Sequence, residues 1–153
     1  MYLENSSNLT IRSLDFNLLP SHPQLVKQLR KLTLHPRSGM NREMNVLFKI
    51  IEKRPVEAQV LLAYRSTKLV AWALLSREHS NMVFSNTWKH FEPTDGMLVE
   101  IYVDPTYRRQ GIGSVLMKVA RRKAGSRQLC VAPWDELSRA FYQTFPNYKN
   151  KWM

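Results

Sequence analysis

The sequence is short of cysteine and glycine: it has one cysteine, Cys130, and five glycines among 153 residues. A single cysteine cannot close an internal disulfide, and we interpret Cys130, in a predicted strand, as a core residue rather than a nucleophile. No apolar run is long enough to cross a bilayer, and the N-terminus lacks the basic start and apolar stretch of a secretory signal. We therefore expect a cytoplasmic protein that does not associate with membranes.

Acidic residues are also scarce: the chain has 12 Asp and Glu residues and 23 Lys and Arg residues, which gives a net charge of +11. Such a surface attracts anions, such as nucleic acid, phosphorylated cofactors or an acidic protein, although it can also serve solubility alone. The four histidines show no metal-ligand spacing, so no metal site is predicted. A hydrophobic content of 44% is typical of a folded chain, and the length favours one domain over residues 1–153.

The spacing of apolar residues predicts alternating strands and helices. Helical periodicity predicts helices over 24–34, 42–53 and from 112 onward, with Lys118, Arg121 and Arg122 of the last pointing away from the core. Strands are expected at 9–14, 97–103 and 127–132, and two more within 58–76 are joined by a hairpin turn at "RSTK". A final helix over 133–145 and a short strand in "NYKNKW" complete a mixed α/β domain, while 77–96 shows no clear pattern.

Two of the five glycines, Gly111 and Gly113, stand between a predicted strand and a predicted helix. The first amides of a helix have no partner within it, the helix dipole adds positive charge there, and glycine lets a phosphate approach the backbone. The pattern, Arg-x-x-Gly-x-Gly over 108–113, fits neither a P-loop nor a three-glycine dinucleotide loop. It predicts a phosphate-binding loop, with a simple turn as the alternative.

The stretch "EIYVDPTYRRQGIGSVLMK", residues 100–118, resembles the acetyl-CoA motif of the GNAT N-acetyltransferases. Downstream, "LCVAPWDELSRAFYQTFPNY" resembles the next motif of that family, although Asn147 and Tyr148 stand where the family usually has Gly-Phe. The resemblance covers nearly the whole chain. It implies the GNAT fold, a mixed, mostly antiparallel central sheet with helices on both faces, here with a shortened C-terminal strand region.

The resemblance also implies that acetyl-CoA is the co-substrate. Backbone amides of 108–113 would hold its pyrophosphate, and Arg108 or Arg109 would add charge. The strand that ends at Val103 would splay from its neighbour and pair with the pantetheine arm, and an N–H near Val103 would polarise the thioester carbonyl. The cofactor-binding residues implied are Ile101, Tyr102, Val103, Arg108, Arg109, Gln110, Gly111, Ile112, Gly113 and Ser114.

Two residues are candidates for proton transfer. Glu100 is a carboxylate in an apolar strand, which is costly unless it is paired, at an edge or lining a cleft. It is interpreted as the base that takes a proton from the amine, with an ion pair to an arginine as the alternative. Tyr142 matches a motif position whose phenol protonates the leaving thiolate, and its alternative role is in the aromatic core.

These observations predict transfer of an acetyl group to an amine by direct attack in a ternary complex. The acceptor stays open: an acidic protein, an aminoacyl-tRNA or a small molecule, bound between the early helices and the stretches 35–45 and 77–96. Trp72, Trp88 and Met40 could line its pocket or serve packing. The alternative is a non-catalytic GNAT-fold protein whose basic face binds nucleic acid or a protein. A homodimer is expected, formed by C-terminal strands that meet at the sheet edge.

Overall fold

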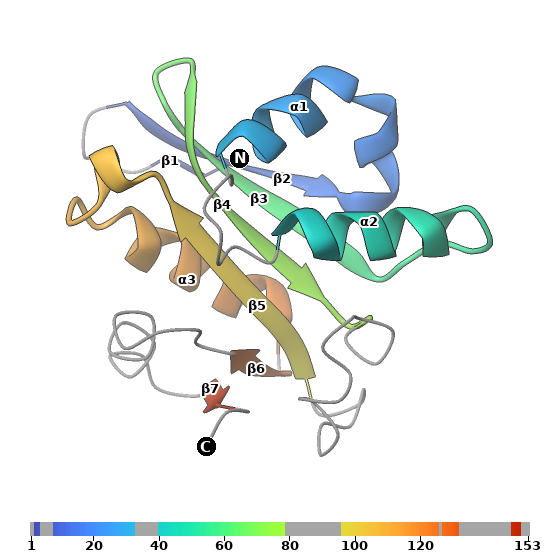
Figure 1. The fold of residues 1–153 in the computed structure, drawn as a ribbon. Helices are drawn as coiled ribbons and strands as arrows, with labels where there is room; N and C mark the ends of the chain where they lie inside the picture. Colours follow the sequence, from blue (N-terminus) through green and yellow to red (C-terminus); the bar gives the residue numbers. More distant parts are fainter. Residues whose placement is uncertain are drawn as a thin grey trace.

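The computed structural model of the protein describes residues 2–3, 8–32, 40–78, 96–125, 127–131 and 148–150. Figure 1 shows a twisted sheet with two helices on one face and one on the other. The strands are β1 (Tyr2–Leu3), β2 (Leu9–Asp15), β3 (Ala58–Arg65), β4 (Lys68–Ser76), β5 (Gly96–Val103), β6 (Gln128–Val131) and β7 (Tyr148–Asn150). The helices are α1 (Pro23–Leu32), α2 (Met40–Ile51) and α3 (Ile112–Ala124), with 3-10 turns at Phe16–Ser21 and Pro105–Tyr107.

The strands lie in the sheet in the order in which they occur in the chain. Each pair from β1 to β5 is antiparallel, whereas β5, β6 and β7 are mutually parallel. This arrangement confirms the predicted mixed, mostly antiparallel sheet. The β3–β4 hairpin turns at the predicted place, where Ser66 has a positive φ of 54°. The three-residue β7 lies at one edge, in agreement with a shortened C-terminal strand region.

Two hydrophobic cores cover the two faces of the sheet. Side chains alternate along a strand, so Leu61 of β3 packs toward α3 while Leu62 packs toward α1 and α2. The α3 core also takes Ile112 and Leu116 from the helix, and the opposite core takes Trp72 from β4. The strands β3 and β4 are therefore buried on both faces of the sheet, as their nearly continuous apolar sequence predicts.

The helices agree with their predicted apolar faces, with one exception on α3. Lys118 and Arg122 are exposed as expected, but Arg121 is half-buried. Its guanidinium donates to the carbonyl oxygens of Gly125, at 2.8 Å, and Arg127. The prediction that it points away was wrong because carbonyls at a helix C-terminus attract a cation.

Some predictions fall on residues that the structure does not describe. The expected helix over 133–145 and most of the stretch 77–96 lie outside the described residues. Among the helices that are described, none is long and apolar enough to span a membrane.

Candidate functional site

The loop between β5 and α3 is built by local hydrogen bonds and two left-handed residues. The carboxylate of Asp104 accepts the N–H of Thr106 at 2.9 Å and so starts the 3-10 turn Pro105–Tyr107. The chain then reverses through Arg109, with φ of 63°, and Gly111, with φ of 81°, before α3 begins at Ile112. Residues with a side chain disfavour this backbone conformation, so glycine fits at position 111. The space beside it is open, since a Cβ added there would meet no atom within 4 Å.

A row of backbone amides in this loop lacks a hydrogen-bond partner among the residues that the structure describes. The first hydrogen bond of α3 runs from the N–H of Val115 to the carbonyl oxygen of Gly111 at 3.1 Å. Within the described part of the chain, the amides of residues 109–114 donate to no other group. The amide of Arg108 differs, because it donates to Pro105 at 3.4 Å within the 3-10 turn. The expected phosphate cradle therefore begins at Arg109, and it lies at a helix N-terminus where anions are favoured.

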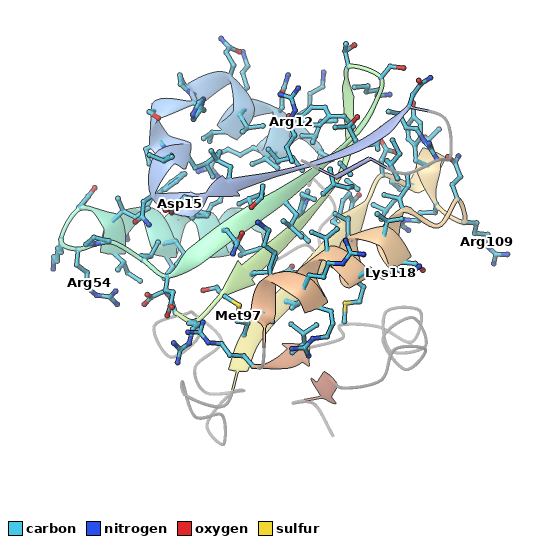
Figure 2. The ribbon with its side chains drawn as sticks, turned by 180° about the vertical axis from the view of Figure 1, so that it is seen from behind. Arg12, Asp15, Arg54, Met97, Arg109 and Lys118 are labelled. Carbon is cyan, nitrogen blue, oxygen red and sulfur yellow. The ribbon has the colours of Figure 1, made fainter. Side chains whose placement is uncertain are left out.

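The β3–β4 hairpin brings two further cations to the loop. Arg65 donates from Nη2 to Oε1 of Gln110 at 3.3 Å, and Nζ of Lys68 lies 5.2 Å from the ring centroid of Tyr107. Figure 2 shows Arg109 projecting outward from the same end of the molecule. Sequence reasoning missed Arg65 and Lys68, which precede the loop by about 40 residues. The signal was available in the hairpin, since an antiparallel β4 must start where β5 ends.

Arg108 turns toward β5 instead of the amide row. Its Nε donates to the carbonyl oxygen of Val103 at 2.9 Å, and its guanidinium lies 5.6 Å from the ring centroid of Tyr102. Both loop arginines expected to serve phosphates are exposed, and they differ in that Arg108 contacts β5.

The last half of β5 has an open edge among the residues that the structure describes. β6 pairs with β5 only over 96–99, while β4 pairs with it through Val103. The N–H of Asp104 donates to Val70 of β4 at 2.9 Å, so the backbone groups of Val103 and Ile101 point the other way, by the alternation along a strand. This half of β5 leads into the loop with the amide row, and the splay expected after Val103 stays a prediction.

Glu100 and Tyr102 extend toward the face of the sheet that carries α1 and α2. Tyr102 is buried and stacks on Trp72 with a centroid distance of 6.1 Å. Glu100 is only partly buried, and its carboxylate has no ion pair with any residue that the structure describes. The structural ion pair considered as its alternative role is thus not found in this part of the chain.

The other pocket candidates have different outcomes. Trp72 is completely buried, so packing is its observed role, and its Nε1 has no hydrogen-bond partner within the described chain. Tyr142 and Trp88 lie outside the described residues, as does the side chain of Met40.

The segment that begins at Arg77 was expected to border the acceptor, yet its first two residues are structural. Glu78 is buried and accepts two hydrogen bonds from Arg54, at 2.7 and 3.2 Å, and one from the N–H of Glu57 at 3.0 Å. The Glu78 carboxylate raises the pKa of Arg54, mainly through this hydrogen bond and then through its charge. Arg77 pairs with Glu57 at 3.1 Å. Both residues thus take part in ion pairs just after β4, and the expectation that this segment borders the acceptor stays a prediction.

No group of three His, Cys, Asp or Glu side chains is placed to hold a metal ion in the described part of the structure. A sequence profile described as the acetyltransferase (GNAT) family matches residues 26–145. The chain belongs to this family. It is therefore an N-acetyltransferase, and its resemblance to the GNAT motifs is confirmed.

Solved GNAT acetyltransferases share the fold at low sequence identity. An aminoglycoside acetyltransferase from an uncultured soil metagenomic sample, in complex with trehalose, is 19% identical with a TM-score of 0.54, over 92% of this chain and 89% of that one. The aminoglycoside N-acetyltransferase AAC(6')-Iy in complex with CoA is 18% identical with a TM-score of 0.55, over 94% and 90%. The ribosomal-protein-alanine N-acetyltransferase of Brucella melitensis biovar Abortus 2308 is 21% identical with a TM-score of 0.51, over 90% of both. No protein of curated function matches the sequence.

Proposed function

We propose that this GNAT acetyltransferase moves the acetyl group of acetyl-CoA to an amine by direct attack in a ternary complex. The amides of residues 109–114 and the second half of β5, neither of which has a partner among the described residues, are the observation that carries the proposal. A helix N-terminus with free amides binds phosphate, and an open strand edge offers hydrogen bonds to an amide-containing arm.

The cofactor would lie along these two features. The amides of Arg109, Gln110, Gly111, Ile112, Gly113 and Ser114 would hold the pyrophosphate. Arg109, Arg65 and Lys68 would supply positive charge around it. Ile101 and the N–H of Val103 would pair with the pantetheine arm, since they point away from β4, whereas the Val103 carbonyl oxygen already accepts the Nε of Arg108. An N–H near Val103 would stabilise the charge that develops on the thioester oxygen.

Proton transfers complete the proposed chemistry. The amine nitrogen attacks the thioester carbonyl carbon, the carbon–sulfur bond breaks, and the sulfur leaves as a thiolate. Glu100 takes the proton lost by the amine, directly or through water, and Tyr142 donates a proton to the thiolate. The partial exposure of Glu100 on the α1 and α2 face supports its part in this scheme.

Two experiments test the proposal. Calorimetry with purified protein should detect binding of acetyl-CoA, and a chain that binds none, with or without candidate amines, would overturn the enzyme mechanism. Mass spectrometry of cell lysate incubated with labelled acetyl-CoA and the protein should then reveal the acceptor. Given the net charge of +11, an acidic protein or an aminoacyl-tRNA is the expected carrier of the amine. A shift of tRNA without acetyl-CoA, combined with no acetyl transfer, would favour the non-catalytic alternative.

We also propose a homodimer and a cytoplasmic location. The short strand β7 lies at the edge of the sheet, and edge strands offer unpaired backbone groups to a second copy. Light scattering on the full chain and on one truncated after Lys149 tests the dimer, which a monomeric full chain at micromolar concentration would refute. Cell fractionation tests the location.

A further inference from the structure

The side chain of Arg108 is held in one orientation by two contacts, both with β5. Its Nε donates to the carbonyl oxygen of Val103, and the guanidinium lies over the Tyr102 ring, 5.6 Å from the ring centroid. The two terminal Nη groups donate to no other residue that the structure describes. A guanidinium held in this way presents a planar pair of donors to solvent.

This pair of donors lies beside Val103, near which an N–H is proposed to stabilise the thioester oxygen. Tyr102 belongs to the sheet face that carries α1 and α2, and Glu100 lies on the same face two residues earlier, about 7 Å along the strand. Arg109, by contrast, projects from the amide row itself (Figure 2). The two adjacent arginines therefore serve two different places.

We propose that Arg108 binds an anionic group of the acceptor, a carboxylate or a phosphate, that lies close to the amine being acetylated. The inference rests on the proposed function and narrows its acceptor to an amine that carries a nearby negative charge. A planar pair of guanidinium donors matches two oxygens of a carboxylate or phosphate. A polycationic acceptor would meet a fixed positive charge at this point and bind poorly.

Matched amines test the proposal by kinetics. The pairs are phosphoethanolamine with ethanolamine, and β-alanine with its amide, so that each pair differs in one anionic group. We expect the native chain to favour the anionic member by at least about tenfold in kcat/KM. Arg108→Gln should abolish this preference, Arg109→Gln should keep it while weakening acetyl-CoA binding, and Lys118→Gln should change neither. A larger preference within the phosphoethanolamine pair would indicate a phosphate as the bound group, and a larger preference within the β-alanine pair would indicate a carboxylate.

A binding measurement covers the case in which these small amines react too slowly. With CoA saturating the cofactor site, titration of inorganic phosphate or acetate should shift the NMR signal of the Arg108 Nε–H saturably. The Arg108→Gln protein should lack that signal and keep the CoA affinity of the native chain within about twofold.

Two results would overturn the inference. One is the absence of any saturable shift in the CoA complex. The other is a loss of CoA affinity in Arg108→Gln as large as that in Arg109→Gln, which would make Arg108 a ligand of the cofactor phosphates. Failure of the native chain to bind CoA would instead overturn the proposed function.

Discussion

The two ends of the β3–β4 hairpin carry charge in opposite ways. At the open end, Glu78 and Glu57 are bound by Arg54, Arg77 and Arg127, with distances of 2.7 to 3.4 Å. At the turn end, Arg65 donates to Gln110 and Lys68 lies over the Tyr107 ring. The carboxylate of Asp104 there accepts the N–H of Thr106. Figure 2 shows the two ends by Arg54 and Arg109, which lie on opposite sides of the molecule.

The difference separates charges that are paired within the fold from charges that we propose bind a ligand. A carboxylate removed from water needs partners, and Glu78 obtains them from Arg54 and a backbone amide. The amides of 109–114, by contrast, donate to no group that the structure describes. They can therefore bind an incoming anion without breaking an internal bond. The variants described next either remove this difference between the two ends of the hairpin or enlarge it.

The largest effect is expected at Gly111. Gly111→Trp should weaken acetyl-CoA binding by at least about 100-fold, because the side chain would fill the space where the pyrophosphate is proposed to lie. Gly125→Trp is the matched control, since Gly125 also has a positive φ, of 64°, and open space around its Cβ position. Calorimetry on both variants checks this. Equal losses of affinity would mean that backbone strain, and not the site, is responsible.

Tyr142→Phe should lower kcat by about 100-fold, as expected for loss of a general acid, while leaving acetyl-CoA affinity nearly unchanged. Steady-state kinetics and calorimetry measure the two quantities separately. A variant that turns over like the native chain would remove Tyr142 from the mechanism.

Glu100→Gln should shift the pH–rate profile toward higher pH, because only amine that is already neutral can attack once the base is lost. Turnover at neutral pH should fall by about tenfold or more. An unchanged pH–rate profile would show that another group accepts the proton. Acetyl-CoA affinity serves as the control and should stay the same.

At the open end of the β3–β4 hairpin, Glu78→Gln should lower the melting temperature by a few degrees, because it leaves Arg54 without its carboxylate partner. The affinity for acetyl-CoA should not change. Glu57→Gln, at a side chain that is about half exposed, should have a smaller effect, since solvent screens exposed ion pairs. Thermal unfolding of both variants measures the two losses of melting temperature. A larger loss in Glu57→Gln than in Glu78→Gln would contradict the view that the buried carboxylate contributes more to stability.

The smallest effect concerns Tyr64, near the turn end of β3. Burial raises the pKa of Tyr64 above its ordinary value of 10.0, and the nearby Arg12 opposes part of that shift. The unfolded chain therefore loses this proton first, so the stability linked to Tyr64 is present below pH 10 and is lost as the pH rises through the raised value. Tyr64→Phe should make the fall of stability above pH 10 slightly shallower in urea titrations. Parallel alkaline slopes would contradict the prediction.

Much of the fold was predictable because its signals are local. Apolar periodicity gave each described helix and each strand from β2 to β6 within a few residues, since a helix or strand buries its apolar side chains at its own period. The glycine loop was predictable for the same reason, because strand, turn and helix N-terminus follow one another directly in the chain. The family then followed from residues 100–118 together with the second motif.

The sequence by itself thus determined the elements and the loop between β5 and α3, which depend on neighbours along the chain. Only the tertiary structure decided that Arg65 and Lys68 join that loop, that Glu78 is a buried ion-pair partner, and that Arg108 turns to Val103 while Arg109 does not. Each of these depends on which strands pair and in which register, or on the φ of a single loop residue. Residues distant in sequence come into contact only when the sheet forms, so a pattern of neighbouring residues does not predict that contact.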